Sequence, residues 1–281
     1  MKPCECPGRY IPEPIKRDAR HRCGFGCIFC GNPIIEYHHI EEWHKVKKHE
    51  AHNITLLCDG DHRRVGAGLI SRDQVIKRNK SPYNRQVGRT PAELLRYEGN
   101  HCVMNLGSRI IFFGLRGMGL NGVSANRLCP LSIRGRAPLS FRFENGQLLL
   151  HADILDRRGN FLLQILDNEL SFTTEGWDAT FVANRLKIIS SLGETRLELE
   201  FQPPDSLTVV HAELFCEGLA VRIDDNGLTL PDFPEFGIAD LGIEKADVAF
   251  AFGALPPGSL AAGMRFEVPQ RPVGGPVADG Q

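Results

Sequence analysis

Three cysteines near the amino terminus constrain the fold of this chain more than any other feature. Cys27 and Cys30 are separated by two residues, and Cys58 lies farther along the chain. Two cysteines at this spacing can direct both thiolates at one tetrahedral metal ion, and a third thiolate from a distant turn closes a loop around it. Because metal binding supplies folding free energy that a small hydrophobic core lacks, the pattern predicts a small domain built around a structural zinc ion.

The sequence leaves the identity of the fourth zinc ligand undecided. Asp61 follows Cys58 at the spacing of the first pair, and a carboxylate can bind zinc, although three thiolates with one oxygen are less common than sets of cysteine and histidine. Cys23, four residues before Cys27, is the alternative ligand, and weak zinc binding is a third possibility. A Cys-x2-Cys motif alone also fits a redox pair or two buried thiols.

Imidazole and amide side chains lie between and after these cysteines. His38 and His39 are adjacent, Asn53 follows them, and His62 comes shortly after the last cysteine. A metal-dependent phosphodiesterase needs these residue types, because imidazoles hold a cation or accept a proton and an amide can orient one of them. The order His, Asn, His is therefore a second signal, and it points to phosphodiester chemistry.

The segments Tyr37-His38-His39-Ile40 and Asn53-Ile54-Thr55-Leu56-Leu57-Cys58, with Cys27-x2-Cys30 before them and His62 after, resemble HNH endonucleases of the ββα-metal superfamily. The resemblance covers roughly residues 20 to 72. At this spacing the cysteines and histidines favour structural zinc over a redox pair. One departure is that relatives usually carry Cys-x2-Cys or Cys-x2-His as the second zinc pair, where this chain has Cys58-x2-Asp61.

The resemblance implies a role for each residue of the motif. His38 and His62 are expected to ligate a catalytic divalent cation, Mg²⁺ or Mn²⁺, while His39 is the general base that activates water and Asn53 orients that base. The family template also places a short strand before the paired histidines, a second strand over Ile54–Leu57 and a short helix that carries His62. Because successive side chains of a strand face opposite ways, the two adjacent histidines cannot do the same job.

Other basic residues surround this motif. Arg63 and Arg64 follow His62 on the expected helix, and they are candidate DNA phosphate contacts or ordinary surface charges. Ser71 with Gln74 forms a capping-box pattern that predicts a further helix through about residue 79. Three more histidines are interpreted as solvated loop residues: His44, His49 and His52.

The charge distribution agrees with a nucleic-acid partner. The whole chain has a net charge of −1, but residues 1–90 hold 17 basic against 10 acidic side chains, about +7, and the remainder holds 16 against 24, about −8. An excess of basic residues over residues 1–90 is expected of a protein that approaches phosphates.

The nine cysteines are odd in number and irregularly spaced, which favours a reducing cytoplasm. No segment of the sequence predicts insertion into a membrane.

We divide the chain into an extended basic arm over residues 1–22, an HNH nuclease domain over 23–100, an all-β domain over 101–252 and a disordered tail over 253–281. The arm is predicted to be extended because of its proline content, with prolines at Pro3, Pro7, Pro12 and Pro14. The tail is rich in Pro, Gly and Ala, and a strand that forms only with a partner is the alternative.

The segment over residues 101–252 predicts an all-β fold, because short β-favouring runs alternate with Gly, Asn and Asp turns. A weak repeat relates Ile165–Phe172 to Ile223–Leu230, and such units can form either a β-solenoid or a sandwich. The fold class is therefore α+β, with a small zinc-bound ββα-metal domain before an all-β domain.

Two functions remain open from the sequence. The first is a metal-dependent endonuclease that hydrolyses DNA, with RNA a less favoured substrate. In this hypothesis the β domain serves targeting, homo-oligomerisation or activation, with phage defence as one setting. The second is a zinc-bearing adaptor that binds nucleic acid or another partner without cutting.

Overall fold

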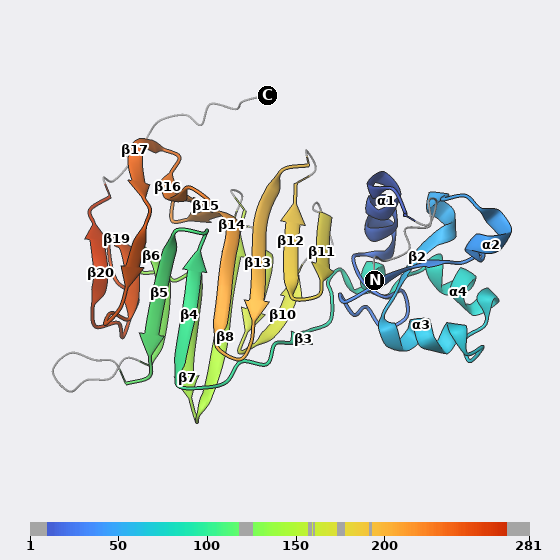
Figure 1. Ribbon diagram of the computed structural model, residues 1–281, viewed down its shortest axis with the longest axis horizontal. Helices are drawn as coiled ribbons and strands as arrows, with labels where there is room; N and C mark the ends of the chain where they lie inside the picture. The colour runs from blue at the N-terminus through green and yellow to red at the C-terminus, as the bar shows by residue number, and fades with distance from the viewer. Residues whose placement is uncertain are drawn as a thin grey trace, which may run out of the picture.

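The computed structural model describes residues 10–117, 126–156, 159, 161–172, 178–190 and 193–268. An N-terminal region of helices around one hairpin precedes a large β region (Figure 1). The N-terminal elements are α1 (Glu13–Cys23), β1 (Glu36–His39), α2 (Trp43–Val46), the 3-10 helix η1 (Ala51–Asn53), β2 (Ile54–Leu57), α3 (Asp59–Gly66), α4 (Arg72–Asn79) and α5 (Tyr83–Val87).

The β region contains β3 (Glu93–Leu94), β4 (His101–Leu106), β5 (Ile110–Leu115), β6 (Arg127–Ile133), β7 (Leu139–Glu144), β8 (Gln147–Leu155), β9 (Phe161–Leu166), β10 (Glu169–Phe172), β11 (Asp178–Val182), β12 (Arg185–Ile189), β13 (Thr195–Gln202), β14 (Ser206–Cys216), β15 (Leu219–Asp224), β16 (Gly227–Leu230), β17 (Phe233–Ile238), β18 (Leu241–Ile243), β19 (Val248–Phe252) and β20 (Ala262–Phe266). No helix in these described ranges is long and apolar enough to cross a membrane.

The N-terminal region has the β1-β2-α3 order that the sequence predicts. β1 and β2 pair antiparallel, with Glu36 opposite Leu57 and His39 opposite Ile54. All four residues of β2 are buried, and its apolar side chains join a small core with residues of α1 and α4, including Ala19 and Val75. The apolar run of β2 therefore fixes the hairpin against the helices.

The predicted capping box is confirmed at the start of α4. The Ser71 hydroxyl accepts from the Gln74 backbone N–H at 3.3 Å, and the Gln74 side chain accepts from the Ser71 backbone N–H at 2.7 Å. Two otherwise unpaired donors of the first turn are satisfied in this way.

The prediction of an extended arm through residue 22 is wrong from Glu13 onward, where α1 begins. Pro12 lies at the N-cap and Pro14 in the first turn, positions at which a helix needs no backbone N–H donor. The proline-rich stretch therefore starts a helix instead of preventing one. Gly24 ends this helix in the left-handed conformation, with φ +70°. Residues 1–9 lie outside the described residues.

The β region is a sandwich of two sheets, which decides between the two predicted architectures. One sheet has the order β20-β19-β6-β7-β8-β9-β10-β3, and the other runs from β11 to β17 with β4, β5 and β18 added through β14. Apolar side chains of both sheets form one core, exemplified by Phe141 and Ile154 from the first and Leu199 and Phe201 from the second. Over the described residues, neither sheet closes into a barrel.

The sandwich extends beyond both of its predicted limits. At the start, β3 pairs with β10, and Leu95 and Tyr97 enter the sandwich core ahead of residue 100. At the end, β20 pairs in parallel with β19, so the prediction of a disordered tail from residue 253 is wrong for Ala262–Phe266. The physical reason is that all five residues of β19 are buried, and such a strand needs neighbours on both sides. Residues 269–281 lie outside the described part.

A buried ion pair joins α1 to the β11 edge of the sandwich, where the N-terminal region lies in Figure 1. Arg20 donates from Nε and Nη2 to the two carboxylate oxygens of Asp178, at 2.8 and 2.7 Å, and both residues are only 2% exposed. The same guanidinium donates to the Tyr37 hydroxyl at 2.6 Å and to Glu13 at 2.7 Å. Tyr37 lies in β1, so this contact reaches the strand that carries the paired histidines.

Candidate metal centre and active site

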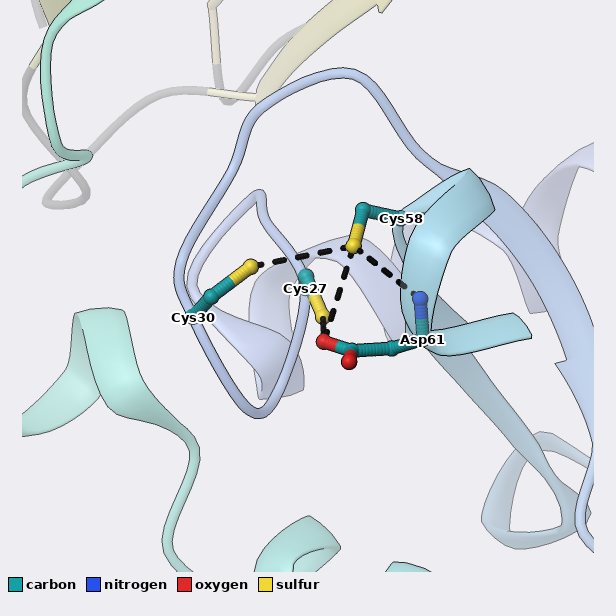
Figure 2. Close-up of side chains that lie close together, drawn as sticks. All are labelled: Cys27, Cys30, Cys58 and Asp61. Atoms are coloured by element: carbon teal, nitrogen blue, oxygen red, sulfur yellow. Dashed lines mark hydrogen bonds between the residues drawn. The ribbon is translucent and has the colours of Figure 1, made fainter. Parts of the chain in front are cut away.

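Four side chains converge where the turn after α1 meets the start of α3 (Figure 2). Cys27 and Cys30 come from that turn, Cys58 is the N-cap of α3, and Asp61 lies in its first turn. Their ligand atoms all lie within 4.8 Å of one another. Zinc–sulfur bonds of about 2.3 Å in a tetrahedron place two sulfurs about 3.8 Å apart, and the Sγ atoms of Cys30 and Cys58 are 3.8 Å apart.

The acid–base state of this cluster also fits a cation. Hydrogen bonding to Cys30 and burial raise the pKa of the Cys27 thiol, and burial raises the pKa of the Cys58 thiol. Three neighbouring thiolates repel one another unless a cation compensates their charge. Zinc supplies the compensating charge and requires the deprotonated form, so the donor set could hold it.

Hydrogen bonds from Asn84 and Arg78 hold the turn that carries Cys27 and Cys30. The buried Asn84 side chain donates to the carbonyls of Gly24 and Gly31, each at 2.9 Å. Gly31 has φ +80°, and a Cβ there would lie 2.2 Å from the Asn84 oxygen, so only glycine fits this turn. Arg78 of α4 donates to the carbonyl of Ile28 at 2.8 Å.

Asp61 is the fourth member of the cluster, and the alternative of Cys23 is wrong. The Cys23 thiol is fully buried and lies 3.7 Å from the Thr55 hydroxyl and 3.8 Å from the Asn79 side chain, away from the four converging ligands. Oδ2 of Asp61 lies 3.2 Å from the Cys27 sulfur, whereas Oδ1 accepts from Arg64 at 2.9 Å. One carboxylate oxygen therefore faces the thiols and the other faces a cation.

Replacing Asp61 with cysteine should slow the release of zinc to a chelator. The change completes a set of four thiolates made of two Cys-x2-Cys pairs, at residues 27 and 30 and at residues 58 and 61. Thiolate is also a softer zinc ligand than carboxylate. Zinc release can be followed with a colorimetric chelator. Asp59→Cys, at an exposed position of the same helix, is the matched control. Faster release from Asp61→Cys than from the parent would contradict a ligand role for residue 61.

The structure brings His38 and His62 together. Their ring centroids are 5.1 Å apart at an interplanar angle of 76°, with His38 from β1 and His62 from α3. Burial, followed by the neighbouring imidazoles, lowers the pKa of His38 to about 4. This imidazole is therefore neutral at physiological pH, the form that offers a lone pair to a metal ion.

Glu36 is a member of this site that the sequence interpretation missed. Its carboxylate lies 2.5 Å from Nδ1 of His62, which leaves Nε2 as the nitrogen of that ring available to a metal ion. A carboxylate of this kind orients a metal-binding histidine and raises its basicity. The two-residue period of a strand could have identified Glu36 from the sequence. Glu36 and His38 are two residues apart and so lie on the same face of β1.

His39 follows His38 in β1, close enough for the two imidazoles to interact electrostatically, and its ring contacts two aromatic side chains. Its Nε2 is 3.2 Å from Nδ1 of His49, and its ring centroid is 5.5 Å from that of Trp43. The interpretation of the three nearby histidines as solvated holds for His44 and His52, whose side chains are 69% and 82% exposed. It is wrong for His49, which is half-buried against His39.

The Asn53 side chain is held by the backbone of Glu41. Its Oδ1 accepts from the Glu41 N–H at 2.7 Å and its Nδ2 donates to the Glu41 carbonyl at 3.1 Å, while the Asn53 carbonyl accepts from Ile40 N–H. These contacts fix the chain segment that leaves His39. Orientation of the base by Asn53 would therefore act through this backbone segment.

The two arginines of α3 each have a carboxylate partner. Arg63 pairs with Asp59, and Arg64 pairs with Asp61 of the metal cluster, although both arginine side chains are mostly exposed. The predicted phosphate contacts of Arg63 and Arg64 would have to compete with these ion pairs. Arg64 is better explained as a residue that orients the ligand Asp61.

Comparison with models of known families matches residues 23–68 to the family described as HNH endonuclease. The matched segment contains the four-residue cluster and all four predicted catalytic residues, and it ends before α4. The search of curated proteins and the search of solved structures found no match. The resemblance to HNH endonucleases is therefore confirmed for this segment, and it supports a nucleic-acid-related, metal-dependent function.

Proposed function

We propose that this protein is a metal-dependent endonuclease that hydrolyses phosphodiester bonds of DNA. The observation that carries the proposal is the 5.1 Å approach of His38 and His62 within the segment that matches the HNH family. These two rings come from different elements, and no packing need of the small core requires them to meet. Their position next to a cluster that could hold zinc supports a working nuclease centre.

The roles of the residues follow from their contacts. A divalent cation such as Mg²⁺ or Mn²⁺ on His38 and His62 would neutralise charge that develops on the scissile phosphate. Glu36 keeps His62 in the tautomer that presents Nε2. His39 accepts a proton from the attacking water, and Asn53 holds the chain that follows this base. The cysteine cluster is structural and takes no part in the reaction.

The charge distribution supports DNA as the substrate, and the free cysteines support a cytoplasmic location. The excess of basic residues over residues 1–90 favours a polyanionic partner, whereas the acidic remainder would avoid one. All cysteines in the described part of the chain are free thiols, which agrees with a reducing cytoplasm. We assign the β sandwich, which Asp178 joins to α1, a role in targeting, oligomerisation or activation, with phage defence as one setting.

Incubation with plasmid DNA tests the proposal. We expect cleavage with Mg²⁺ or Mn²⁺ and none with EDTA, and we expect His39→Ala to lower the rate by about 10²- to 10⁴-fold, because general-base catalysis typically contributes that much. The products are measured on agarose gels over time. The zinc content of the variant should be unchanged.

His52→Ala is the matched control, since His52 is an exposed histidine of the same region. A His39→Ala variant with full activity would remove His39 from the mechanism. If the wild-type protein slows DNA migration in a gel but cuts it with none of the divalent cations tested, the adaptor hypothesis is favoured instead.

A further inference from the structure

The rings of His39, Trp43 and His49 form a compact group beside β1. Trp43 and His49 are stacked, with ring centroids 4.2 Å apart and planes only 17° from parallel. His39 contacts both rings, at 5.5 Å from Trp43 and 5.3 Å from His49. The Trp43 and His49 rings therefore limit the rotation of the His39 imidazole.

The polypeptide is folded to bring His49 to this place. Trp43 is the first residue of α2, and the helix stops after one turn at Lys47, whose φ of +48° is left-handed. This sharp reversal returns the chain to His39, so that His49 stacks on Trp43 while its Nδ1 reaches Nε2 of His39 at 3.2 Å. Both the stacking on Trp43 and the contact with His39 distinguish His49 from a solvated loop histidine.

The distance between the two nitrogens has a consequence for the tautomer of each ring. A hydrogen bond between two neutral imidazoles needs one protonated and one unprotonated nitrogen. If Nδ1 of His49 carried the hydrogen, Nε2 of His39 would accept it, and the hydrogen of His39 would lie on Nδ1. If Nε2 of His39 carries the hydrogen, Nδ1 of His39 holds the lone pair. Only the second arrangement leaves His39 with a basic nitrogen outside the His39–His49 contact.

We propose that His49 is a positioning residue for the general base: its Nδ1 accepts a hydrogen bond from Nε2–H of His39 and so fixes the tautomer in which Nδ1 of His39 takes the proton from water. Trp43 holds the plane of His49 and thereby the direction of this bond. The inference rests on the proposed nuclease function, because it assigns which atom of His39 acts as the base. It adds His49 and Trp43 to the residues that shape the site.

Two substitutions separate the hydrogen bond from the stacking. His49→Phe keeps an aromatic ring against Trp43 but has no acceptor, whereas His49→Asn keeps an acceptor near the position of Nδ1 but loses the ring. We expect His49→Phe to lower kcat by roughly 10- to 100-fold, the usual cost of losing a partner of a site residue, with little change in KM. His49→Asn should recover most of that loss. His44→Phe, on the exposed face of α2, is the control that should change neither parameter.

Long-range ¹H–¹⁵N NMR of the imidazole nitrogens gives a readout that does not depend on cleavage. In the zinc-loaded wild-type protein, His39 should be predominantly the Nε2–H tautomer, and His49→Phe should convert it to a mixture of tautomers. A wild-type His39 with its hydrogen on Nδ1, or a His49→Phe variant that keeps both its kcat and its tautomer, would overturn the inference. If wild-type protein cuts no DNA, the proposed function fails, and the tautomer measurement still decides the pairing of His39 with His49.

Discussion

Replacing Cys58 with serine should release the zinc and unfold the N-terminal region while the β sandwich stays folded. Structural zinc is worth about 10–16 kcal/mol in small zinc-binding domains, which is as large as the roughly 5–15 kcal/mol net stability of a typical domain. The N-terminal region has only a small core of its own around Ile28, Ile54 and Leu56. Hydrogen exchange is the decisive measurement, and it should show lost protection over β1 and β2 with retained protection in strands such as β13.

The control is Cys216→Ser, which changes a half-buried thiol of the sandwich. We expect it to leave the zinc content at one equivalent per chain, as a single four-ligand site requires. A Cys58→Ser protein with full zinc content and unchanged protection of β1 would show that Cys58 is no ligand. Extended treatment of the wild-type protein with a strong zinc chelator should reproduce the effect of the substitution.

Replacing Arg20 with leucine should destabilise the protein by about 3–5 kcal/mol, because the buried carboxylate of Asp178 loses both hydrogen bonds from Arg20 and keeps only Arg17, at 3.9 Å, as a cationic neighbour. Burial alone would lower the pKa of Arg20, but its hydrogen bonds to Asp178 and Tyr37 raise the pKa overall, so the guanidinium stays charged. Chemical denaturation followed by circular dichroism measures the loss. The rate of the proposed nuclease reaction should fall as well, since Tyr37, which accepts from Arg20, precedes His38 in β1.

A double-mutant cycle tests whether the partner is Asp178. Combining Arg20→Leu with Asp178→Leu removes both charges, and the double variant should be more stable than Arg20→Leu alone. The exposed pair of Arg109 and Asp240 provides the comparison, and the same substitutions there should change stability little. Equal losses for Arg20→Leu and for Arg109→Leu would contradict a structural role for the buried pair.

The sequence predicted the hairpin and its cysteine cluster well because each is marked by a local sequence pattern. The cysteine spacing, the apolar run of β2 and the capping box of α4 each lie within a few residues, and each maps directly onto the structure. Glu36 was also within reach, since strand periodicity places it beside His38. His49 was not, because its contact with His39 depends on the left-handed turn at Lys47, which no residue type in that stretch requires.

The long-range features could not be predicted in the same way. Arg20 and Asp178 are 158 positions apart, and nothing near either residue marks it as the partner of the other. The choice between solenoid and sandwich depends on pairings between distant strands, such as the parallel contacts of β4 with β14 and of β6 with β19. Alternating apolar residues are the same in both architectures, so the local pattern carries no information about which strands meet.

The contact between Asp61 and Arg64 affects the charge that the cysteine cluster would carry with zinc bound. Three thiolates and one carboxylate around a divalent ion carry a formal charge of about −2, which would repel a nearby phosphate backbone. Arg64 and the positive end of the α3 dipole offset part of that excess. Arg64 would thus serve as a counterion to the metal-loaded cluster, and attraction of the DNA strand would fall to basic residues elsewhere, such as Lys77 and Lys80 at the end of α4.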